Sequence, residues 1–94
     1  MEKKVKLHMG CGYIKLAGWI NVDLSRSCGP DLVADLSQSL PFQSGSVDYI
    51  HSEDFLDQLE LVDAYVFLRE SFRILKEGGV MRILTPDLNE FARR

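Results

Sequence analysis

Residues 5–23, VKLHMGCGYIKLAGWINVD, place a glycine turn and a carboxylate where both could contact a ligand. Gly10 and Gly12 directly follow an apolar segment. Because neither has a β-carbon, the chain can bend sharply there and a ligand can approach the main chain. A second apolar segment ends at Asp23, whose carboxylate can accept hydrogen bonds from hydroxyl groups. A backbone bend beside a carboxylate is a common way to hold a nucleoside, so these features predict a nucleotide site.

The spacing of the glycines bears on which kind of nucleotide site this is. The dinucleotide fingerprint GxGxxG needs a third glycine where this chain has Lys15, and an acidic residue about 20 positions further on. Asp23 comes sooner than that, so a nicotinamide-dependent oxidoreductase is a weak alternative. Taken alone, the turn fits a nucleotide site and an ordinary tight turn equally well.

Length, charge and cysteine content narrow the class of protein. The chain has 94 residues, of which 46% are hydrophobic, which predicts one globular domain over residues 1–94. A net charge of -3 argues against a nucleic-acid partner. The longest apolar run, residues 64–68, is too short to cross a membrane, and no secretory signal is recognisable, so we expect a cytoplasmic protein. Cys11 and Cys28 lack the spacing of a zinc site, which predicts reduced thiols and no metal.

Hydrophobic periodicity predicts the elements that position these residues. Short apolar segments bounded by glycine, serine and proline predict strands at residues 5–9, 19–24, 31–36, 47–51 and 80–85. From about residue 59 apolar residues recur every three or four positions, which predicts an amphipathic helix that closes at Gly78. Residues 87–94 could begin another helix. The pattern predicts an α/β protein with an open, mainly parallel, Rossmann-like sheet of about five strands. The carboxyl edge of that sheet, where ligands bind, carries Gly10, Asp23, Asp35, Ser52 and Asp87.

The segments that follow the glycine turn make the pattern more specific. They are a strand ending at Asp23, a strand ending at Asp35 and Leu36, then LPF, SVDYIHSEDFLDQL and LRESFRILKEGGVMRILTPDL. As a set, over residues 4–88, they closely resemble the class I S-adenosylmethionine-dependent methyltransferases. The nearest pattern is that of small bacterial members with LxLGCG and GxxNVD motifs. The resemblance implies S-adenosyl-L-methionine as cofactor, S-adenosylhomocysteine as product and methyl transfer to an unidentified small molecule.

The resemblance also implies roles for single positions in binding the cofactor. Asp23 would accept hydrogen bonds from both ribose hydroxyls. Asp35 would face the adenine amine, and the main chain at Leu36 would meet a ring nitrogen. The methionine part would lie against the main chain of the turn, formed by Gly10, Cys11 and Gly12.

Residues after the fourth strand are implied to lie near the transferred methyl group. His51, Ser52 and Glu53 would line the sulfonium and the path of the methyl group. Methyl transfer depends mainly on alignment of the two reactants, so a conspicuous catalytic residue is not required. If the acceptor is a hydroxyl or an amine, a base would help, and the candidates are His51, Glu53, Asp54 and Asp87.

The length of the chain leads to two further expectations. Members of the family usually continue after the fifth strand into another helix and two more strands, so the chain is expected to be truncated or a fragment of a longer gene. An uncovered, apolar fifth strand predicts pairing with a second copy as a homodimer. The alternative function is a truncated, catalytically inactive cofactor-binding or assembly module of the same fold.

Overall fold

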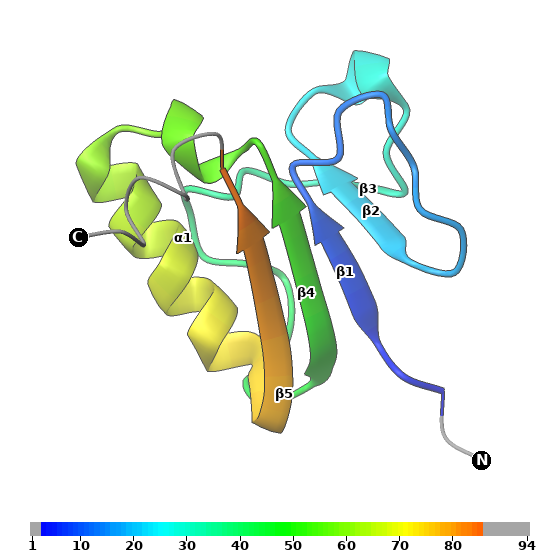
Figure 1. Ribbon diagram of the computed structural model, residues 1–94, viewed down its shortest axis with the longest axis vertical. Helices are drawn as coiled ribbons and strands as arrows, with labels where there is room; N and C mark the ends of the chain where they lie inside the picture. The colour runs from blue at the N-terminus through cyan, green and yellow to red at the C-terminus, as the bar shows by residue number, and fades with distance from the viewer. Residues whose placement is uncertain (1–2, 86–94) are drawn as a thin grey trace.

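A computed structural model describes residues 3–85 and shows an open sheet of parallel strands (Figure 1). The strands are β1 (Lys6–Met9), β2 (Ile20–Asp23), β3 (Leu32–Val33), β4 (Val47–Glu53) and β5 (Leu75–Leu84). One α-helix, α1 (Leu61–Ile74), and two short 3-10 turns, η1 (Arg26–Cys28) and η2 (Leu56–Gln58), complete the described chain. The sheet order is β3-β2-β1-β4-β5, and every strand pair is parallel. The α/β, Rossmann-like fold predicted from the sequence is confirmed.

Strand order reverses beside β1. From β1 the chain moves outward to β2 and β3, then returns across β1 to β4 and continues outward to β5. Open parallel sheets bind their ligands at the carboxyl ends of the strands next to such a reversal. The register places Met9 opposite both Val22 and Ser52, so β1, β2 and β4 end close together at this edge.

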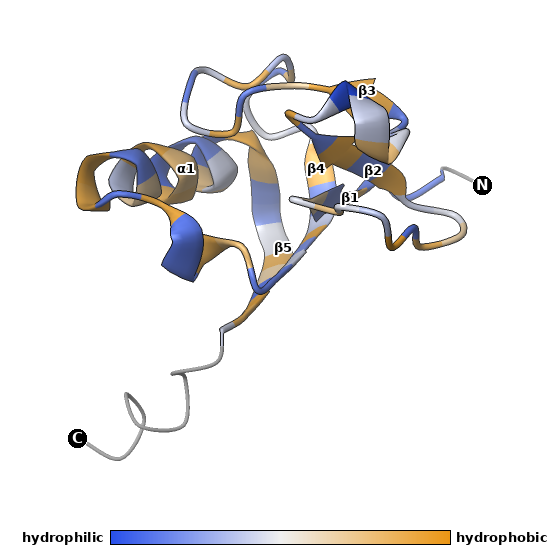
Figure 2. Cartoon of the chain, turned by 90° about the horizontal axis from the view of Figure 1, so that it is seen from above, coloured by the Kyte–Doolittle hydropathy of each residue, from blue (hydrophilic) through white to orange (hydrophobic). Residues whose placement is uncertain are grey.

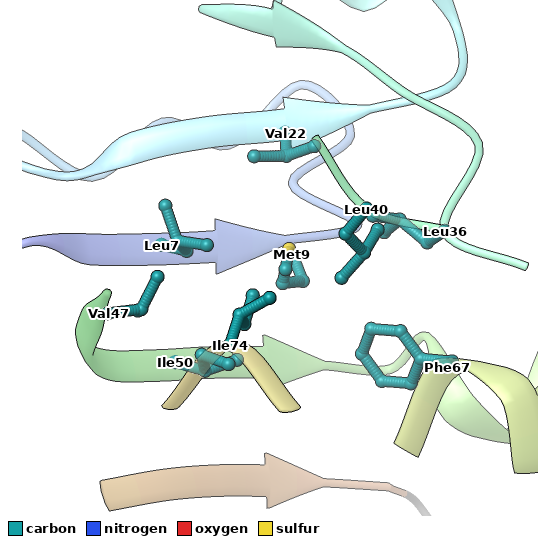
Figure 3. Close-up of a cluster of buried hydrophobic side chains, with 9 residues drawn as sticks. All are labelled: Leu7, Met9, Val22, Leu36, Leu40, Val47, Ile50, Phe67 and Ile74. Carbon is teal, nitrogen blue, oxygen red and sulfur yellow. The ribbon is translucent and has the colours of Figure 1, made fainter. Parts of the chain in front are cut away.

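One face of the sheet carries the apolar core. Side chains alternate between the two faces of a strand, so Leu7 and Met9 in β1 point to the same side. They meet Phe67 and Ile74 of α1, and all four are fully buried (Figure 3). The remaining members of the buried cluster are Val22, Leu36, Leu40, Val47 and Ile50. Leu36 and Leu40 belong to the connection between β3 and β4, which therefore helps α1 to cover the sheet.

The end of the helix differs from the sequence prediction. The helix was expected to close at Gly78, but α1 ends at Ile74 and β5 begins at the next residue. Leu75 pairs with Val47, and Val80 pairs with Tyr49, so residues 76–79 bulge out of β5. Gly78, with φ of 83°, serves this bulge rather than a helix cap. The apolar pattern of a helix continues past Ile74, but Leu75 is extended and pairs with Val47 of β4, so the helix ends there.

Two other strand boundaries also differ from prediction. β3 was expected over residues 31–36 but comprises only Leu32–Val33, so Asp35 and Leu36 lie just beyond it. β4 was expected to end at residue 51 but continues to Glu53, so Ser52 lies inside the strand. The expected helix over residues 87–94, and with it Asp87, falls outside the described residues. No helix within residues 3–85 is long and apolar enough to cross a membrane.

Candidate functional site

The glycine turn lies at the carboxyl end of β1 and is tied to β2. The N–H groups of Gly10 and Cys11 both donate to the carbonyl of Val22, at 2.9 and 3.1 Å. Gly10 and Gly12 have φ of 69° and 56°, the left-handed region that side-chain-bearing residues rarely adopt. The sharp bend predicted from the two glycines is therefore present, and β2 fixes its position.

Asp23 ends β2 and accepts two main-chain hydrogen bonds. Its Oδ2 accepts the N–H of Gly12 at 2.9 Å, and its Oδ1 accepts the N–H of Ser25, also at 2.9 Å. Each carboxylate oxygen keeps one further lone pair for a ligand. The two bonds fix the orientation of the carboxylate before any ligand arrives, because rotating it would break both.

A cavity of about 270 Å³ opens beside these residues at the carboxyl edge of the sheet. The chain segments that follow β2, β3 and β4, together with the first turn of α1, form its wall. The lining residues are Asp23, Leu24, Asp35, Leu36, Ser37, Phe55, Leu59 and Asp63. The structure thus brings Asp23, Asp35 and Leu36, three residues predicted from the sequence, onto one concave surface.

A local turn holds the carboxylate of Asp35. Its Oδ1 accepts the N–H of Ser37 at 2.9 Å and the Ser37 hydroxyl at 2.6 Å. These hydrogen bonds, the side-chain one first, lower the pKa of Asp35 below its ordinary value. Asp35 is therefore ionised at neutral pH and available to accept a hydrogen bond from a ligand amine.

An ion pair on α1 holds the segment that carries Leu36. Arg73 Nε donates to Glu70 Oε2 at 2.8 Å, and Glu70 Oε1 accepts the N–H of Leu40 at 2.7 Å. Arg73 also donates to the carbonyls of Leu40 and Phe42. The hydrogen bonds to Arg73 and to the Leu40 N–H lower the pKa of Glu70 to about 2. This arrangement fastens one wall of the cavity to the helix.

Phe55 is a site residue that sequence reasoning missed. Its ring lies against Gly10 so closely that a β-carbon at that position would come within 2.6 Å of it. The ring also makes an edge-on contact with Phe67, with 5.2 Å between centroids, and it lines the cavity. In the segment SEDFLDQ, the predicted candidates are the polar residues Ser52, Glu53 and Asp54. Its aromatic residue after a run of polar ones was the available signal.

Two more predicted residues, Cys11 and Ser52, lie in the glycine turn and beside the last residue of β1. Cys11 is buried, and this burial raises the pKa of its thiol, so it is a small buried side chain and not a thiolate nucleophile. Ser52 is 1% exposed, opposite Met9 in the register, and its hydroxyl has no partner within the described part of the chain.

Three of the proposed catalytic residues lie outside the cavity wall. His51 Nε2 lies 3.4 Å from Glu53 Oε1. His51 pairs in register with His8, and the rings of these two histidines are 5.5 Å apart. His8 lies between the core residues of β1, so both histidines are on the sheet face away from α1. Asp54 is exposed, with φ of 53°, and its N–H donates to the carbonyl of Leu84.

The sheet order, the reversal beside β1 and the glycine turn at the carboxyl edge define a Rossmann-like α/β protein of the class I methyltransferase kind. A family model described as a methyltransferase domain matches residues 7–83. The chain therefore belongs to this methyltransferase domain family, as the motifs predicted.

One solved structure similar to this chain comes from Methanococcus maripaludis, where the protein is named as a candidate S-adenosyl-L-methionine-dependent methyltransferase. The TM-score is 0.72 at 20% sequence identity, and the match covers 96% of this chain and 60% of that chain. At this identity the likeness supports the fold. The chain spans about three fifths of the length of that neighbour. No curated protein matches the sequence.

Proposed function

We propose that the chain binds S-adenosyl-L-methionine in the cavity beside Asp23 and serves methyl transfer to a small-molecule acceptor. The observation that carries this proposal is the placement of Asp23, Asp35 and Leu36 on one cavity at the reversal of strand order. Membership of the methyltransferase domain family supports it.

The cavity suits the adenosine part of this cofactor. Asp23 has a free lone pair on each oxygen, which matches two neighbouring ribose hydroxyls. Asp35 is ionised and can accept a hydrogen bond from the adenine amine. Leu36 and Leu59 offer apolar contact for the ring. Carboxylates are the only charged groups of the lining, within the described chain, so the wall also favours a ligand that bears positive charge.

The glycine turn would hold the methionine part. We assign Gly10, Cys11, Gly12 and Ser52 to it. The Ser52 hydroxyl, which has no partner within residues 3–85, lies beside the strand end that leads into the turn. Phe55 fills the space in front of Gly10, so its ring must move aside for the methionine part to reach the main chain. When bound, the cofactor supplies an electrophilic methyl group.

The candidate bases on the acceptor side are His51, Glu53, Asp54 and Asp87. His51, Glu53 and Asp54 lie near the carboxyl end of β4, and Asp87 lies outside the described residues. His51 Nε2 lies 3.4 Å from Glu53 Oε1, so the carboxylate could orient the imidazole as a base that activates a hydroxyl or amine acceptor. We propose that the acceptor is a small molecule and that the protein acts in the cytoplasm, with a second copy of the chain as its protein partner.

A second candidate function is a cofactor-binding or assembly module that transfers no methyl group. The packing of Phe55 against Gly10 favours it, because the ring occupies the space where the methionine part would lie. The two functions predict different outcomes in solution. A domain active in methyl transfer binds the whole cofactor, whereas such a module could bind adenosine as tightly as the complete cofactor.

Calorimetric titration of the full chain tests the proposal. We expect S-adenosyl-L-methionine and S-adenosylhomocysteine to bind, and NAD, which needs the missing third glycine, not to bind. Adenosine serves as the control ligand. If it binds as tightly as the complete cofactor, the methionine part makes no contact and the module function is favoured. If neither cofactor form binds, or if NAD binds better, the proposal is wrong.

A further inference from the structure

The outward side of α1 carries a row of exposed apolar side chains. Leu61 is 88% exposed, Tyr65 52%, Leu68 39% and Phe72 81%, whereas Phe67, Ser71 and Ile74 face the core and are buried. Apolar positions recur along α1 in Figure 2. Exposed apolar surface that is continuous along an element marks an interaction site more often than scattered apolar residues do. We call the row formed by Leu61, Tyr65, Leu68 and Phe72 the α1 seam.

The spacing of the α1 seam indicates that its partner is another helix. Its members follow one another at intervals of four, three and four residues. This is the heptad spacing, which averages 3.5 residues and keeps one narrow seam against a facing helix. A helix that only covers a sheet does not need a second seam, and the core-facing residues of α1 already cover the sheet.

The order of side chains in the seam is self-complementary in the antiparallel sense. When two copies of α1 run antiparallel about a two-fold axis between residues 66 and 67, Leu61 faces Phe72 of the second copy. Tyr65 then faces Leu68 of the second copy, and the two-fold axis repeats both pairs. Each facing pair in this arrangement therefore consists of one leucine and one aromatic side chain. In the parallel arrangement, the aromatic rings would face each other and the leucines would face each other.

The charges along α1 favour the same arrangement. Asp63 lies in its first turn, and Asp57 and Glu60 lie in the segment just before it. Its carboxyl-terminal half carries Arg69 and Arg73, of which Arg73 pairs with Glu70, and Lys76 lies just beyond it in β5, so this end is basic on balance. Antiparallel helices bring the acidic end of one copy beside the basic end of the other, and also oppose the two helix dipoles. Parallel helices would bring like charges together.

The sequence predicts that the free edge of β5 pairs with a second copy. In the structure this edge is less suited to forming a dimer than the α1 seam is. β5 is at the edge of the sheet in the described chain, but residues 76–79 bulge out of it and Arg82 is exposed along it. Bulges and charged residues are features that discourage pairing at a strand edge. We propose that two copies of this chain associate through the α1 seam, with their helices antiparallel.

Sedimentation velocity on the full chain tests the surface. We expect the wild type to dimerise, and Phe72→Glu to raise the dissociation constant at least about 30-fold, as loss of a large aromatic interface residue does. The matched control is Val62→Glu, which adds the same charge at a residue 69% exposed on the same helix but outside the seam. It should leave the dissociation constant within about threefold of the wild type. A wild-type monomer at up to about 1 mM, or equal effects of the two variants, would overturn the proposal.

Cysteine cross-linking tests the orientation. In a Cys28→Ser background, with Cys11 buried, the double variant Leu61→Cys, Phe72→Cys should form intermolecular disulfides under mild oxidation. Leu61→Cys alone should not, because the two copies of residue 61 would lie about 16 Å apart along antiparallel helices. Efficient cross-linking of Leu61→Cys alone would show parallel helices. Failure of the double variant to cross-link at a concentration where sedimentation shows it to be dimeric would show that the seam does not pair with itself, and either result overturns the proposal.

Discussion

Asp23 and Gly12 are joined by a hydrogen bond of 2.9 Å from the Gly12 N–H to the carboxylate, which links the end of β2 to the glycine turn after β1. The same side chain is therefore both part of the candidate site and a support for the turn. If a bound ligand shifts the Asp23 carboxylate, the hydrogen bond carries that shift to the main chain at Gly12. The geometry makes the two halves of the candidate site interdependent.

Replacing Asp23 by alanine should weaken binding of S-adenosyl-L-methionine by about 1 to 3 kcal/mol, the range for hydrogen bonds to a charged group. The loss comes from the ribose hydroxyls and from the released turn. Calorimetry on the purified variant measures it, and Asp57→Ala is the control, because Asp57 is exposed and outside the cavity wall. Equal affinities for the wild type and Asp23→Ala would show that the ribose site lies elsewhere.

Gly10→Ala should destabilise the fold more than Gly45→Ala does. Both glycines have φ near 65° to 69°, but a β-carbon at Gly10 would lie 2.6 Å from Phe55, and one at Gly45 would meet no atom within 4 Å. Gly45→Ala should cost about 1 kcal/mol of unfolding free energy for the backbone conformation. Gly10→Ala should cost about 1 to 3 kcal/mol more for the clash.

Denaturant unfolding of both variants gives the comparison. A Phe55→Ala background supplies a second check, because it removes the ring atoms at 2.6 Å and should reduce the cost of Gly10→Ala. The β-carbon of residue 55 stays, 2.9 Å from the added one, so Gly10→Ala should still cost more than Gly45→Ala. If the two alanine variants are equally stable in the presence of Phe55, the close contact between Gly10 and Phe55 is wrong.

The ion pair between Glu70 and Arg73 should make the free energy of unfolding fall as the pH is lowered. Folding lowers the pKa of Glu70 from 4.5 to about 2, so its contribution is complete above about pH 5 and declines as the pH falls toward 2. At neutral pH, Glu70→Gln should lower the unfolding free energy by about 1 to 3 kcal/mol. The difference between wild type and variant should then shrink as the pH falls. A difference that stays constant from pH 7 to pH 2 would rule out this ionisation.

Much of the site followed from the sequence because parallel strands align their carboxyl ends. Gly10 and Asp23 end neighbouring strands, so their proximity required only the correct strand order. Asp35 reached the same edge although β3 is shorter than expected, because the N–H of the preceding Ala34 donates to the carbonyl of Asp23 at 3.1 Å. The bounds of β5 did not follow, since the helical pattern of the sequence continues past the point where Leu75 joins the sheet.

Phe55 could not be placed from the sequence for a different reason. Its contact with Gly10 depends on the path of the chain after β4, where η2 returns the segment toward the end of β1. Hydrophobic periodicity in the sequence predicts helices and strands, but it does not predict the path of a loop such as this one. The α1 seam was visible only as part of a helical pattern, because the sequence did not separate the side chains that face the core from those left exposed.

An amide NMR titration with S-adenosyl-L-methionine tests the central claim most directly. The Gly12 and Ser25 amides bond to Asp23, so both signals should shift as the cofactor saturates. The amides of Gly45 and Ser46 bond to the last residues of α1, Arg73 and Ile74, and should not move. Saturable binding that leaves Gly12 and Ser25 unmoved, or no binding at all, would contradict the proposal that this cavity holds the cofactor.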